Sequence, residues 1–69
     1  MDQQINSLVN AVHKLTPSME TSEIEYLITQ MSQRSGIGPM TILNILYDDL
    51  RTGIPFRYTA VGKIRSIFL

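Results

Sequence analysis

The chain of 69 residues contains no cysteine, no tryptophan and a single histidine. Without cysteine it can form neither a disulfide nor a thiolate metal site, so the fold must rest on its own packing or on a partner's surface. Proteins of the cytosol commonly lack disulfides. No apolar run approaches the roughly 20 residues of a membrane span, and no basic start precedes an apolar stretch. We therefore expect one cytoplasmic domain over residues 1–69 with no metal, no cofactor and no membrane partner.

Residues that could support catalysis are equally scarce. His13 lies beside the apolar stripe of its predicted helix, where a structural role is the ordinary one. No serine stands in a Gly-x-Ser-x-Gly setting. Asp48 and Asp49 are adjacent, so on a helix they point about 100° apart instead of converging on a metal. We expect that the protein is not an enzyme.

The charges are balanced overall but unevenly distributed. The formal net charge is zero, with six basic and six acidic residues. Residues 1–33 contain one basic and four acidic residues, whereas residues 34–69 contain five basic and two acidic residues. A strongly basic domain is the usual mark of a nucleic-acid-binding protein, and this chain is not strongly basic. Binding to an anionic partner would therefore require the C-terminal half, or two copies that pool their basic residues.

The spacing of apolar residues by three and four predicts an all-α fold of four helices. Their expected ranges are 2–15, 21–35, 39–51 and 55–68. Asp2 can cap the first helix, and Thr16-Pro17 ends it. For the second helix, the pair Ser22 and Glu25 has the spacing of a capping box.

Glycine and proline mark the junction of the second and third helices. Gly36 can adopt the left-handed conformation that ends a helix, and Pro39 suits the first position of the next one. The third helix leaves only a narrow polar stripe, which predicts that most of it is buried. The members of this stripe are Thr41, Asn44, Asp48 and Arg51.

The tail from residue 55 onward has two possible structures. β-Branched and aromatic residues, with Gly62 as a turn, would suit a β-hairpin wing. Helical periodicity favours a fourth helix instead, because apolar and polar residues fall on two separate faces. The apolar face consists of Phe56, Ala60, Val61, Ile64, Ile67 and Phe68, and the polar face of Thr59, Gly62, Lys63 and Ser66.

Residues 28–47 form the most informative segment. Ser32 is a small residue four positions before Gly36, and apolar residues follow at Ile37, Ile42 and Ile45. This segment resembles the helix-turn-helix of lac-type and lambda-type repressors. The resemblance implies that the third helix enters the DNA major groove. It also implies base contacts from Gly38, Pro39, Met40 and Asn44, with Arg34 and Thr41 near phosphates.

The side chains at these positions suggest how such contacts would work. Asn44 can form two hydrogen bonds with adenine, and Met40 can lie against a thymine methyl group. If the fourth helix packs beside the third, further phosphate contacts could come from Arg51, Arg57, Lys63 and Arg65. We expect double-stranded DNA as the partner and a homodimer as the binding form. By analogy, minimal transcription regulators of this kind are common in phages and mobile elements.

A protein-protein interaction module is the alternative. Such a module, for example a small inhibitor or adaptor, would use the same helical surface without DNA. The chain has more apolar side chains than one small domain easily buries. They include Met40, Leu43, Tyr47, Ile54, Phe56, Phe68 and Leu69, and among them we expect the partner interface at Tyr47, Phe56, Phe68 and Leu69. The two functions are compatible in a dimeric DNA-binding protein.

Overall fold

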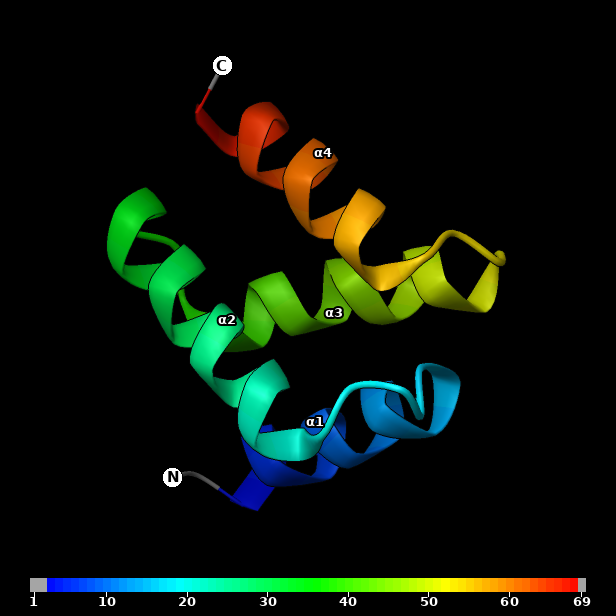
Figure 1. The fold of residues 1–69 in the computed structure, drawn as a ribbon. Helices are drawn as coiled ribbons and strands as arrows, with labels where there is room; N and C mark the ends of the chain where they lie inside the picture. The colour runs from blue at the N-terminus through cyan, green and yellow to red at the C-terminus, as the bar shows by residue number, and fades with distance from the viewer. Residues whose placement is uncertain (1–2, 69) are drawn as a thin grey trace.

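The protein consists of four α-helices (Figure 1). In this computed structural model the backbone is described for residues 3–68 and the side chains for residues 3–62. The helices are α1 (Gln3–Leu15), α2 (Thr21–Ser35), α3 (Pro39–Arg51) and α4 (Phe56–Phe68), and this part of the chain contains no strand. The predicted all-α fold is confirmed, with each described boundary within one residue of expectation. The tail is a helix and not a hairpin, while Asp2 and Leu69 lie outside the described residues.

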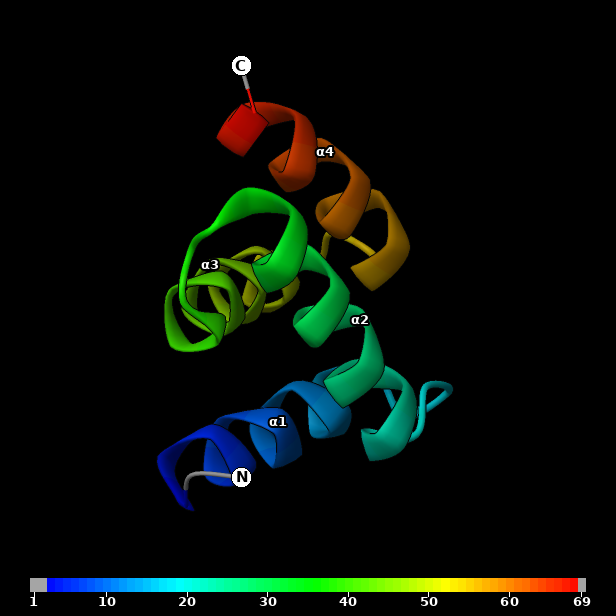
Figure 2. The same cartoon turned by 90° about the vertical axis from the view of Figure 1, so that its left-hand side faces the viewer.

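Helix α3 occupies the centre of the molecule. It packs against the other three helices, whereas α1 and α4 lie on opposite sides of it and do not touch within the described residues. The same order, with α1 below and α4 above, is visible in Figures 1 and 2. Because α3 is enclosed in this way, Ile42, Leu43 and Leu46 have an exposure of 1% or less. The narrow polar stripe predicted for this helix is its exposed side.

The core draws apolar side chains from every helix. Val9 and Val12 come from α1, and Ile24 and Ile28 come from α2. Burial of each such side chain contributes about 1.5–3 kcal/mol to the free energy of folding. The other buried apolar residues are Met19, Met31, Ile42, Leu43, Leu46, Leu50, Phe56 and Ala60. Leu43 and Phe56, which we had counted among the surplus apolar residues, are therefore core residues.

The start of α2 differs from the prediction. Glu20 is the N-cap residue, and its backbone N–H donates to Oε1 of Glu23 at 3.4 Å. The predicted capping pair of Ser22 and Glu25 is wrong, because Thr21 is already helical and the capping residue stands one position before it.

Side-chain hydrogen bonds fix the corner between α2 and α3. Gly36 has φ 73°, the left-handed conformation, and its N–H donates to the Ser32 carbonyl at 2.9 Å. The Ser32 hydroxyl donates to the Ile37 carbonyl at 2.7 Å, which explains the need for a small hydroxyl residue here. The Ser35 hydroxyl donates to the Met31 carbonyl at 2.7 Å and accepts the Ile37 N–H at 3.1 Å. Figure 2, which looks nearly along α3, shows α2 running across it.

Helix α4 is rotated relative to the predicted amphipathic pattern. Thr59, assigned to the polar face, is 3% exposed, and Val61, assigned to the apolar face, is 54% exposed. The face that packs on the rest of the molecule consists of Phe56, Thr59 and Ala60. This face follows the spacing of three and four, but its centre is fixed by the contacts with α3 and α2, which periodicity alone does not specify.

His13 has a structural contact. Its Nδ1 atom donates to the Met19 carbonyl at 2.6 Å, which ties the end of α1 to the loop before α2. No group of three metal-ligating side chains occurs among the described residues. Within the same residues, no helix is long and apolar enough to cross a membrane.

Candidate functional site

The leading end of α3 lies at the surface. Gly38, Thr41 and Asn44 are exposed there, and Pro39 and Met40 are half-buried. The five predicted contact residues on this helix end thus share its first two turns. Gly38 is the N-cap and offers no side-chain hydrogen bond, so the first N–H groups of α3 lack a side-chain cap. Such groups can donate to an anionic oxygen.

Asn44 is the residue in this region with the best chemistry for reading a base. Its Nδ2 atom donates to the Met40 carbonyl at 3.0 Å. An amide nitrogen has two hydrogens, so one donor and the carbonyl oxygen remain for a ligand. A donor beside an acceptor is the pattern that adenine requires in the major groove.

The far end of the exposed α3 stripe contains an ion pair. Asp48 and Arg51 lie 3.9 Å apart with both side chains largely exposed, and Arg51 also lies over the Tyr47 ring at 5.6 Å from its centroid. An exposed pair of this kind contributes about 0–1 kcal/mol to the free energy of folding. Arg51 therefore stands about three and a half turns from Gly38 beside an acidic neighbour, a less favourable place for a phosphate contact than we expected.

The remaining predicted phosphate contacts separate into two groups. Arg34 and Arg57 line a hollow between α2 and α4. For Lys63, Arg65 and Phe68 only the backbone is described, as part of α4, so their predicted contacts lie outside the described side chains.

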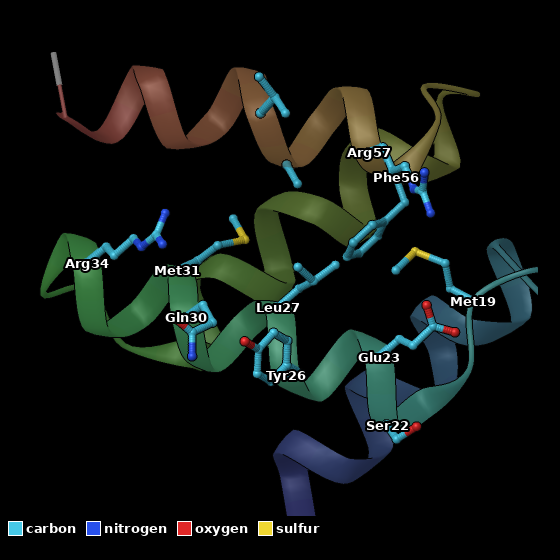
Figure 3. A pocket seen from close by; sticks show the side chains of 12 residues that line it. Met19, Ser22, Glu23, Tyr26, Leu27, Gln30, Met31, Arg34, Phe56 and Arg57 are labelled. Carbon is cyan, nitrogen blue, oxygen red and sulfur yellow. The ribbon is translucent and has the colours of Figure 1, made fainter.

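This hollow, the α2–α4 groove, has a volume of about 720 Å³ (Figure 3). Its floor and walls are mainly apolar, and charged side chains stand at its rim. The lining consists of Met19, Ser22, Glu23, Tyr26, Leu27, Gln30, Met31, Arg34, Phe56, Arg57, Ala60 and Val61. Size and lining are those of a site that binds apolar groups.

Two apolar residues at the groove are unusually exposed. Tyr26 is 64% exposed and Val61 is 54% exposed. Of the expected partner residues, Phe56 lies in the groove but is 3% exposed, and Tyr47 is half-buried beside Arg51. The groove was not predicted from the sequence, and Tyr26, a large aromatic residue on the exposed side of α2, is the residue that could have indicated it. The groove forms between α2 and α4, which are not consecutive in the sequence, so local sequence patterns do not indicate it.

Comparisons of the chain with protein-family models, with curated proteins and with solved structures give no match. The helix-turn-helix resemblance therefore rests on residues 28–47 themselves. Two surfaces of the described residues bear on function: the leading end of α3 and the α2–α4 groove.

Proposed function

We propose that the protein is a small DNA-binding transcription regulator that inserts the leading end of α3 into the major groove of double-stranded DNA. One observation supports this proposal most directly. The three-residue corner at Gly36–Gly38 is held by the hydrogen bonds of Ser32 and Ser35, and the first two turns of α3 after it are exposed. A helix that enters a groove must project its first turns in this way.

Each contact in this proposal has a defined chemical role. The free donor and acceptor of Asn44 pair with adenine, and the half-buried Met40 contacts a thymine methyl group. The Thr41 hydroxyl and the uncapped N–H groups of α3 bind phosphate oxygens and fix the position of the helix. Arg51 can contact a phosphate only when its side chain leaves the ion pair with Asp48.

The charge balance determines the expected strength of binding. A neutral chain with an Asp–Arg pair on its exposed α3 face receives little general attraction to DNA. One copy should therefore bind weakly, and two copies on adjacent half-sites should bind far more tightly.

Fluorescence anisotropy of labelled random duplexes at low salt tests the proposal. Wild-type protein should bind at tens of micromolar, and binding should weaken as salt is added. The double variant Asn44→Ala, Arg51→Ala should abolish binding while circular dichroism shows unchanged helicity. Asn10→Ala, which removes an exposed asparagine from α1, is the matched control and should bind normally. No wild-type binding at that concentration, or equal binding by the double variant, would overturn the proposal.

A protein-interaction module is the second candidate, and the α2–α4 groove supports it. Contiguous apolar surface rimmed by charge is typical of protein interfaces. If the groove alone mediates function, Asn44 would be dispensable, whereas changes at Tyr26 would remove the interaction.

A further inference from the structure

We propose that the α2–α4 groove binds a second copy of this chain, with the two α2 helices antiparallel about a two-fold axis. This inference goes beyond DNA binding and does not depend on it, because its test involves no DNA.

The shape of the surface suits self-association. In a two-fold interface the same patch is present on both partners, so it must provide both projecting and receiving groups. Tyr26 and Val61 project, with exposures of 64% and 54%. Leu27, Met31 and Phe56 point into the hollow between them (Figure 3). The same surface therefore provides both the projecting and the receiving groups that a two-fold interface requires.

The charges on α2 favour this same pairing. Glu23 and Arg34 stand near opposite ends of the groove (Figure 3), and neither has an ion-pair partner among the described residues. They are eleven residues apart, about 16 Å along the helix and on nearly the same face. A helix with opposite charges at its two ends is complementary to an antiparallel copy of itself.

The sequence positions define the register of this pairing. With the two-fold axis between Ile28 and Thr29, Glu23 of each copy faces Arg34 of the other. The same axis places Tyr26 of each copy opposite position 31 of the other, where the largely buried Met31 forms part of the groove lining. A parallel arrangement in the same register would bring like charges together. Arg57 is on the opposite wall, contributed by α4, and takes no part in this α2 pairing.

Sedimentation velocity of the full chain, from about 1 µM to about 500 µM, measures the association. The expected mass rises with concentration from 7.8 kDa toward twice that value. Glu23→Arg alone and Arg34→Glu alone should each weaken the dimer by about tenfold or more, because like charges then face each other. An equimolar mixture of the two variants should form a heterodimer, because both facing pairs are again opposite in charge.

A pair of tyrosine variants provides the matched control. Tyr26→Asp should weaken the dimer by about tenfold or more, because a carboxylate replaces a buried interface aromatic. Tyr58→Asp should not, since Tyr58 is similarly exposed at 73% but does not line the groove. Circular dichroism of every variant checks that the helices are retained.

Three results would overturn the proposal. The first is a wild-type chain that stays monomeric at all concentrations, which would leave the groove to a helix of another protein. The second is a dimer that survives both charge reversals and Tyr26→Asp. The third is a mixture of folded charge variants that remains monomeric, which would exclude the antiparallel pairing.

Discussion

At the scale of single residues, Thr59 is the clearest imperfection in the packing. Its side chain is 3% exposed, and its hydroxyl has no hydrogen-bond partner among the described residues. A buried hydroxyl without a partner costs about 1–3 kcal/mol of stability. At position 59 a more apolar residue should therefore increase the stability of the fold.

Thr59→Val should raise the free energy of unfolding by about 1 kcal/mol, because it removes the unpaired hydroxyl and retains the branched shape. For a domain of this size the melting temperature should rise by about 4–8 °C. Thermal unfolding followed by circular dichroism measures the change. Thr59→Ser, which keeps the hydroxyl and loses the methyl group, should be less stable than wild type. A valine variant less stable than wild type would contradict this account.

Residue types alone did not specify which side of α4 would be buried. Helical periodicity predicts Val61 inside and Thr59 outside, which is the usual order of preference, and the structure has the reverse. The centre of a buried face is decided by neighbouring helices, and in α4 the nearest are α3 and α2. By contrast, the buried residues of α2, Ile24, Ile28 and Met31, keep the spacing of four and three that is typical of an amphipathic helix.

At the scale of elements, two glycines have opposite roles. Gly36 ends α2 in the left-handed conformation, which other residues adopt at a cost of about 1 kcal/mol. Gly62 lies inside α4, where glycine is destabilising relative to alanine by roughly 0.5–1 kcal/mol. At both positions an added Cβ meets no atom within 4 Å, so backbone conformation alone decides the effect.

Gly36→Ala should therefore lower the free energy of unfolding by about 1 kcal/mol, and Gly62→Ala should raise it by about 0.5–1 kcal/mol. Urea denaturation followed by circular dichroism gives both values on the same scale. The two variants serve as controls for each other, since they make the same chemical change. Equal signs for the two effects would show that conformation is not the deciding factor.

Helix boundaries were predictable because the sequence marks them locally. Pro17, Gly36 and Pro39 each act on the conformation of one or two residues, and the helices end or begin beside them. The α2–α4 groove was not predictable in this way. It is formed by side chains from α2, from α4 and from the loop before α2. Its width depends on how α2 and α4 both pack on α3.

At the scale of the whole molecule, association and stability should be linked. The core of a 69-residue chain is small, and burial of the α2–α4 groove would add apolar contact that the monomer lacks. If folded copies associate, the folded state gains stability as protein concentration rises.

The melting temperature of the wild-type chain should therefore increase with protein concentration, whereas that of Tyr26→Asp should increase less. Thermal unfolding at about 5 µM and about 500 µM would reveal the difference, because this hundredfold range changes the association term by about 2.7 kcal/mol per dimer. Tyr58→Asp should behave like wild type. A wild-type melting temperature independent of concentration would count against the dimer.

The exposed stripe of α3 also has a consequence for the proposed DNA-binding function. Thr41, Asn44, Asp48 and Arg51 are exposed, while the other side chains of this helix are buried or half-buried. If α3 reads DNA as proposed, mutational tolerance and recognition coincide in a single row of four positions. A library randomised at these four sites should yield mostly folded proteins, so new specificities could be selected without redesign of the scaffold.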